Sequence, residues 1–145
     1  MSQRLSSDML HATTVAKDGR AVLISGRSGS GKSDLALRLL DRGFVLVSDD
    51  QTYVRIAGGK LVAAAPPTIL GKLEVRGIGI VEVDHVDEAT VCLVVELSAH
   101  IERLPDDGRE RLILRVKIPL VSIDAQLASA PAKVAIALDM LGLKP

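Results

Sequence analysis

Apolar residues fall in short runs along the chain, and several of these runs predict β-strands. Ala21 to Ser25 has the pattern of a buried strand and leads directly into a glycine cluster, and Phe44 to Val47 is a second such run. Thr90 to Leu97, the most continuously apolar stretch, and Ile78 to Val83 are predicted to be core strands. These runs indicate a β-sheet at the centre of the fold.

Two other segments have the spacing of α-helices. From Lys32 to Arg42 apolar side chains recur at intervals of three and four, and Gly43 follows as the expected C-terminal cap. Ala132 to Leu141 has the same spacing, with Gly142 behind it. A strand, a glycine loop and a helix therefore follow one another early in the chain.

The remaining segments predict a hairpin, two late strands and a surface loop. Thr52 to Ile56 is expected to pair with Lys60 to Ala64, which makes the sheet mixed. Leu112 to Leu114 and Ile118 to Ile123 are expected to be late strands, and the charged segment from Arg103 to Glu110, with its proline and glycine, a surface loop. We expect an α/β fold in which helices flank a mixed sheet.

Chain length and charge limit the possible functions. At 145 residues the chain is expected to form a single domain over residues 1–145. Eighteen basic residues balance eighteen acidic ones, and the only aromatic side chains are Phe44 and Tyr53. Since nucleic-acid binding usually needs a basic surface or aromatic stacking platforms, no nucleic-acid partner is expected.

The single cysteine and the absence of long apolar runs bear on location. Cys92 lies inside an apolar run and has no second cysteine to pair with, which suits a buried strand thiol in a reducing compartment. No apolar run approaches the roughly 18–20 residues of a membrane span, and Met1 to Asp8 lacks the apolar core of a signal peptide. We expect a cytoplasmic protein with no membrane partner.

The glycine cluster matches the phosphate-binding loop pattern at every fixed position. It reads Gly26-Arg27-Ser28-Gly29-Ser30-Gly31-Lys32-Ser33, with Arg27 and Ser28 at variable positions. In such a loop the backbone N–H groups and the positive end of the following helix bind phosphate, while Lys32 reaches the β- and γ-phosphate oxygens. Ser33 would then ligate Mg²⁺. The loop predicts nucleotide binding.

Magnesium-assisted phosphoryl transfer also needs a carboxylate, and Asp49-Asp50 is the leading candidate. The pair ends the strand that follows the loop helix, so a right-handed parallel crossover would bring it to the ligand-binding edge of the sheet. One carboxylate could then lie beside the metal while the other acts as a base. A solvated turn or a helix cap is the alternative, and Glu96, at a second strand end, is another candidate on the metal side.

Two weaker signals have equally ordinary explanations. The segment Glu74 to Ile80 places an acid and Arg76 beside two glycines, a spacing suited to backbone passing near an anion. An exposed Glu and Arg flanking a turn would give the same pattern. A lone histidine such as His11 is more often an ordinary surface residue than a functional one.

Taken in order, these segments resemble HPr kinase/phosphorylase, a bacterial enzyme that phosphorylates a serine of the small phosphocarrier protein HPr. The resemblance runs through His11, the glycine loop, Asp49-Asp50, the segment Glu74 to Ile80, Arg103-Leu104 and Val116 to Pro119. It implies a P-loop kinase core related to phosphoenolpyruvate carboxykinase, with ATP and Mg²⁺ as cofactors. It also implies HPr as substrate, a homo-oligomer that is hexameric in the family, and a part in regulating carbon metabolism through the phosphotransferase system.

The resemblance also implies roles for individual residues. Asp50 corresponds to the proton acceptor for the substrate serine, and His11 to the histidine beside it. The other matches are Lys32 as a phosphate-binding catalytic residue, Ser33 and Glu74 as Mg²⁺ ligands, and Arg103 as a catalytic arginine.

The sequence departs from the family in two places. Longer relatives carry an N-terminal domain without a counterpart here, and their Pro-Val-Arg-Pro-Gly-Arg-Asn segment is replaced by Asp124 to Ala130, which contains neither arginine. Because the family uses that segment for dephosphorylation, we expect the kinase reaction to outweigh the phosphorylase reaction. The alternatives are a kinase or carboxykinase-like enzyme for a small metabolite and a non-catalytic nucleotide sensor.

Overall fold

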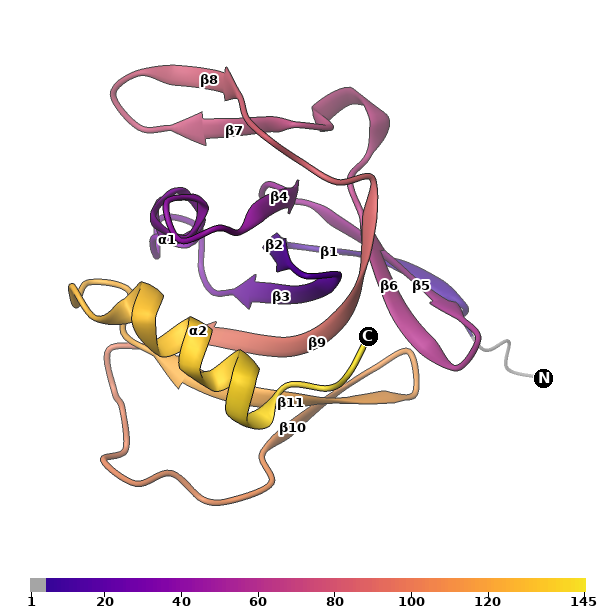
Figure 1. Cartoon of the computed structure of the whole chain (residues 1–145), viewed down its shortest axis with the longest axis vertical. Helices are drawn as coiled ribbons and strands as arrows, with labels where there is room; N and C mark the ends of the chain where they lie inside the picture. The colour runs from indigo at the N-terminus through magenta and orange to yellow at the C-terminus, as the bar shows by residue number, and fades with distance from the viewer. Residues whose placement is uncertain (1–4) are drawn as a thin grey trace.

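A curled, mixed sheet runs through the computed structural model, which describes residues 5–145 (Figure 1). The first residues of the stretch expected to lack a signal peptide, 1–4, lie outside the described residues. The main strand order is β1-β5-β6-β9-β3-β2-β4, and β11 also pairs with β9 and with β10. The strands are β1 Ser7–Leu10, β2 Ala12–Lys17, β3 Arg20–Ser25, β4 Val45–Ser48, β5 Thr52–Ala57, β6 Lys60–Ala64, β9 Glu88–Leu97, β10 Glu110–Ile113 and β11 Val116–Ile123.

Both expected helices are present and cover one face of the sheet. They are α1, Lys32–Leu40, and α2, Ala130–Leu141, and their apolar side chains pack in one cluster with residues of β3 and β9. Gly43, just beyond α1, has a φ of 88°, which suits the expected glycine cap. Among the described residues no helix is both long enough and apolar enough to cross a membrane.

The opposite face of the sheet has its own core, because the sheet curls over it. Successive residues of a strand point to opposite faces, so Ile24 packs with the helices while Leu23 packs with Leu61 of β6 and Ile118 of β11. The expected hairpin is confirmed, since β5 pairs with β6 around Gly58-Gly59. The two expected late strands are also present, as β10 and β11, and they pair with each other.

One predicted core strand is wrong. Residues 79–82 form β8 (Gly79–Glu82), which pairs with β7 (Lys72–Val75) in a separate two-stranded ribbon that projects from the main sheet (Figure 1). Only one side of the ribbon is covered: Leu73 is fully buried, whereas Ile78 and Ile80 are 77% and 73% exposed. A short apolar run does not distinguish a ribbon of this kind from a buried strand, whereas the longer run of β9 is buried as predicted.

The strand β2 was not predicted, and it decides the geometry of the site. It forms a hairpin with β3 around Asp18-Gly19, a dipeptide typical of tight hairpins, and its other edge pairs with β4. Because β2 is antiparallel to both neighbours, β4 runs in the same direction as β3 without touching it. The predicted parallel direction is therefore right, although β2 lies between the two strands. The ends of β3 and β4 meet the start of β2 at one sheet edge.

Candidate functional site

The phosphate loop connects β3 to α1 and is already folded. Gly29 and Gly31 have φ values of 79° and 102°, which favour glycine, and the backbone N–H of Ser30 donates to the carbonyl of Arg27 at 3.0 Å. A side chain at Gly26 would come within 2.6 Å of Ser30 Oγ. The glycines are therefore required by the loop's conformation, and the N-terminus of α1 follows directly after it.

Two polar groups inside this loop fit an anionic ligand. Lys32 is only 6% exposed, and its Nζ donates to the carbonyls of Gly26 and Arg27 at 3.0 and 2.9 Å. The hydroxyl Oγ of Ser30 is buried and has no hydrogen-bond partner among the described residues. A confined ammonium group, an unsatisfied hydroxyl and a helix N-terminus together suit a bound phosphate chain.

Asp49 joins the phosphate loop to two other elements. Its Oδ1 accepts hydrogen bonds from Ser33 Oγ at 2.6 Å and from Thr13 Oγ1 at 3.1 Å, and its Oδ2 accepts one from the backbone N–H of Glu74 at 3.0 Å. The residue is 7% exposed. The first carboxylate of the pair is therefore buried and fixed by α1, β2 and β7, which excludes the solvated turn for this residue.

The second carboxylate of the pair faces the histidine that the sequence singled out. His11 Nε2 lies 2.7 Å from Asp50 Oδ1, with side chains 50% and 60% exposed. The φ of Asp50 is 66°, an uncommon conformation for a residue with a side chain, and its N–H donates to Thr13 Oγ1 at 3.1 Å. Thr13 thus contacts both aspartates, a role that no sequence motif indicated.

The side chains of two predicted site residues form no hydrogen bond with this network among the described residues. Glu74 reaches Asp49 only through its backbone, and its side chain and that of Arg76 are exposed beside a turn, as the alternative interpretation held. Arg103 lies in the exposed loop between β9 and β10, as the loop prediction required, and forms no ion pair within residues 5–145. Their assigned roles stay predictions.

The side chains beside the loop also fit a magnesium ion. Ser33 Oγ and the Asp49 carboxylate are oxygen donors, which Mg²⁺ prefers, and Mg²⁺ usually completes its shell with phosphate and water. Groups of three or more His, Cys, Asp or Glu placed to hold a metal are absent from the described part of the chain. Glu96, the other candidate on the metal side, forms an ion pair with Arg111 at 2.8 Å and is not hydrogen-bonded to Ser33 or Asp49.

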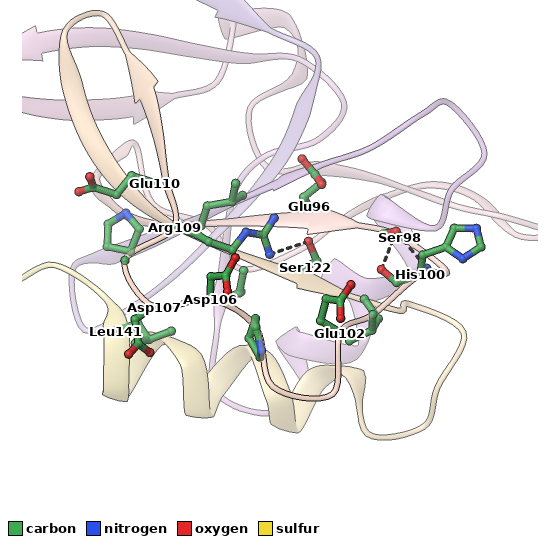
Figure 2. Close-up of a pocket in the computed structure, with 16 residues that line it drawn as sticks. Glu96, Ser98, His100, Glu102, Asp106, Asp107, Arg109, Glu110, Ser122 and Leu141 are labelled. Atoms are coloured by element: carbon green, nitrogen blue, oxygen red, sulfur yellow. Dashed lines mark hydrogen bonds between the residues drawn. The ribbon is translucent and has the colours of Figure 1, made fainter.

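Two hollows lie near the same sheet edge. The larger, about 470 Å³, is lined by the end of β9, the loop that follows it, β11 and the end of α2, and Arg109 donates to Ser122 there at 3.1 Å (Figure 2). Its lining contains five acidic residues, together with apolar ones, and does not include Lys32. The smaller, about 350 Å³, is lined partly by His11, Ser25 and Arg111 and so adjoins the His11–Asp50 pair.

Known proteins are similar to this chain in sequence. An HPr kinase/phosphorylase of Clostridium botulinum (strain Eklund 17B / Type B) is 40% identical over 102 residues, 68% of this chain and 34% of that protein. An HPr kinase/phosphorylase of Lacticaseibacillus casei (strain BL23) is 32% identical over 139 residues, 87% of this chain and 44% of that protein. The chain therefore spans less than half the length of these relatives.

The fold has a solved counterpart in the Hpr(Ser) kinase/phosphatase from Coxiella burnetii. The two structures match with a TM-score of 0.81 at 27% sequence identity, over 91% of this chain and 88% of that one, which confirms the P-loop kinase fold. The model of the family described as the HPr Serine kinase C-terminal domain matches residues 3–139. The chain belongs to the HPr serine kinase C-terminal domain family.

Proposed function

We propose that this chain transfers the γ-phosphoryl group of ATP to a serine hydroxyl of an HPr-type phosphocarrier protein. The observation that carries the proposal is the contact between His11 and Asp50 at 2.7 Å, because it lies on the same hydrogen-bonded network as the phosphate loop. Thr13 contacts both aspartates, and Asp49 contacts Ser33 at the start of α1. A base and a phosphate cradle thus share one edge of the sheet.

The loop residues would bind the nucleotide. Backbone N–H groups at the start of α1 would donate to the phosphate chain, and Lys32, which donates to the carbonyls of Gly26 and Arg27, would donate to phosphate oxygens. Ser33 and Asp49 would hold Mg²⁺. When bound, the ion neutralises negative charge on the phosphoryl oxygens.

The surroundings of the two aspartates divide their roles. Asp49 is buried and held by three hydrogen bonds, so a substrate hydroxyl on the surface of another protein reaches it less readily than it reaches Asp50. Asp50 is exposed and has one side-chain partner, His11. A serine hydroxyl is a poor nucleophile until a base takes its proton, and Asp50 would take that proton while the hydrogen bond from His11 orients the carboxylate.

Several finer expectations belong to the same proposal. Kinase activity should outweigh phosphate-driven dephosphorylation, because the segment that carries two arginines in the family carries Gln126 and Ser129 here. A buried, unpaired Cys92 suits the reducing cytoplasm, and the family suggests a homo-oligomer. Sedimentation of the purified chain tests the oligomeric state.

The deciding experiment is mass spectrometry of HPr after incubation with this protein, ATP and Mg²⁺. The proposal expects one added phosphoryl group on a serine, lost when that serine is replaced by alanine. Labelled ATP incubated with a metabolite pool tests the small-metabolite kinase. Tight ATP binding without phosphoryl transfer to either acceptor would indicate a nucleotide sensor and contradict the proposal.

A further inference from the structure

An ion pair lies next to the start of the phosphate loop. Arg111 of β10 donates to Glu96 Oε2 at 2.8 Å and to Ser25 Oγ at 3.0 Å. Ser25 is the residue before Gly26, where the loop begins. Ser25 and Glu96 are register partners in the parallel pair of β3 and β9, so the guanidinium group bridges the ends of two neighbouring strands.

The position of Glu96 would be unfavourable for nucleotide binding if its charge stood alone. Its side chain is 40% exposed, and its carboxylate lies beside the start of a loop suited to an anion, where another negative charge repels phosphate. Like charges near a binding site weaken affinity even without contact, since Coulomb interactions extend over roughly 10 Å at moderate salt. Arg111 supplies the compensating charge and also holds the Ser25 hydroxyl.

We propose that Arg111 is a positioning residue for nucleotide binding: it neutralises Glu96 and fixes Ser25 at the base of the phosphate loop. This inference rests on the proposed function, because it assumes a phosphate ligand in the loop. Arg111 acts through Glu96 and Ser25 and needs no contact with the nucleotide.

The chain contains a matched control for this ion pair. Glu88, at the other end of β9, pairs with Arg55 of β5 at 2.9 Å, and its carboxylate is 53% exposed. The two pairs resemble each other in distance and exposure, but Glu88 lies at the start of β9, the end of the strand away from the phosphate loop. If both ion pairs only stabilised the fold, removing either arginine would have the same effect on Mg²⁺–ATP affinity. If the charge of Glu96 acts on the nucleotide, only the loss of Arg111 lowers that affinity.

The test is calorimetric measurement of Mg²⁺–ATP affinity for a set of variants. We expect Arg111→Ala to weaken binding roughly three- to tenfold, the effect of one uncompensated charge near a partly exposed site. Arg111→Ala combined with Glu96→Gln should restore affinity to within about twofold, and the loss in the single variant should shrink at high salt. Arg55→Ala should leave affinity unchanged.

Separate outcomes overturn the separate claims. If the native protein fails to bind Mg²⁺–ATP, the proposed function is wrong and the inference falls with it. If the native protein binds and Arg111→Ala binds equally well, or if Glu96→Gln restores nothing, the inference alone is wrong. If Arg111→Ala does not fold, the single variant Glu96→Gln still tests the inference. It should bind Mg²⁺–ATP at least as tightly as the native protein, and weaker binding would contradict the inference.

Discussion

Nε2 of His11 and Oδ1 of Asp50 lie 2.7 Å apart although 39 positions separate the two residues in the chain. They meet because β2 starts where β4 ends, and the hydroxyl of Thr13 holds the backbone of Asp50 in place. Both strands belong to the sheet, so this contact is positioned by a rigid element. Single substitutions should therefore change the chemistry at this pair without moving it.

Asp50→Asn should lower the rate of phosphoryl transfer by a factor on the order of 10² or more, as removal of a general base usually does. Asparagine tolerates the positive φ of Asp50 and keeps a hydrogen-bonding oxygen, so the fold and ATP affinity should change little. Single-turnover rates and ATP affinity measured side by side separate chemistry from binding. A fully active Asp50→Asn variant would assign the base elsewhere.

Asp49→Asn should lower the stability of the fold and weaken the binding of Mg²⁺. In asparagine an amide NH₂ group replaces one of the two carboxylate oxygens, and this group cannot accept a hydrogen bond. At least one of the three donors that now bind Asp49 therefore loses its acceptor. Such a loss costs about 1–3 kcal/mol of the free energy of unfolding. We also expect a higher Mg²⁺ concentration for half-maximal activity. Urea unfolding and a Mg²⁺ titration measure the two effects, and an unchanged unfolding midpoint would contradict the first.

Lys32→Met should abolish detectable nucleotide binding and phosphoryl transfer, because the charge that serves the phosphates is lost while the buried stem is kept. The carbonyls of Gly26 and Arg27 lose their donor, so we expect a decrease in stability of only about 1 kcal/mol. Calorimetry with ATP and a thermal melt check both statements. Native-like affinity in this variant would remove the loop from the mechanism.

Cys92 predicts a pH dependence of stability. Burial raises the pKa of its thiol, and Arg20 opposes part of that rise. The folded chain therefore keeps the proton at a pH where the unfolded chain, with a thiol pKa of about 8.5, loses it. The associated stability is fully present below that pH and decreases as the pH rises above it.

Comparison with Cys92→Ala isolates this thiol from the other groups that titrate at alkaline pH. Between neutral pH and pH about 10, the native protein should lose more unfolding free energy than the variant. The thiol is fully buried, so it should react with a thiol reagent slowly in the native state and rapidly in urea. Parallel pH profiles for the two proteins would show that the thiol titrates alike in both states.

Phosphate-driven removal of the phosphoryl group from serine-phosphorylated HPr should be slow relative to the kinase reaction. Gln126, which replaces an arginine of the family segment, has its Nε2 3.9 Å from where a Cβ of Gly31 would lie, and Arg38 holds the neighbouring carbonyl of Ala125 at 2.6 Å. A neutral amide beside the loop cannot hold a second phosphate as a guanidinium group does.

Pyrophosphate release from phosphorylated HPr at millimolar phosphate measures this activity. Gln126→Arg should increase the rate, and a native rate comparable to that of the kinase reaction would refute the prediction.

Local patterns predicted the parts of the site that the chain builds from neighbouring residues. The phosphate loop and α1 are encoded by glycine spacing and helical periodicity, so both were found. Thr13 and Arg111 were missed because their partners lie far away in the sequence, and only the order of strands in the sheet brings them together. The dipeptide Asp18-Gly19 is typical of a tight hairpin and could have indicated β2 as the strand before β3. That strand is the neighbour of β4 in the sheet.

The placement of β2 between β3 and β4 has a consequence for how the chain folds. His11 and the Asp49-Asp50 pair flank one continuous stretch, β2-β3-α1-β4, which contains the phosphate loop and whose strand pairings join segments closer in sequence than β3 and β9 are. Contacts of short sequence separation close small loops and form quickly, whereas β9 must return from a distant part of the chain to pair with β3. The stretch that carries most of the site is therefore able to organise before the rest of the sheet has closed around it.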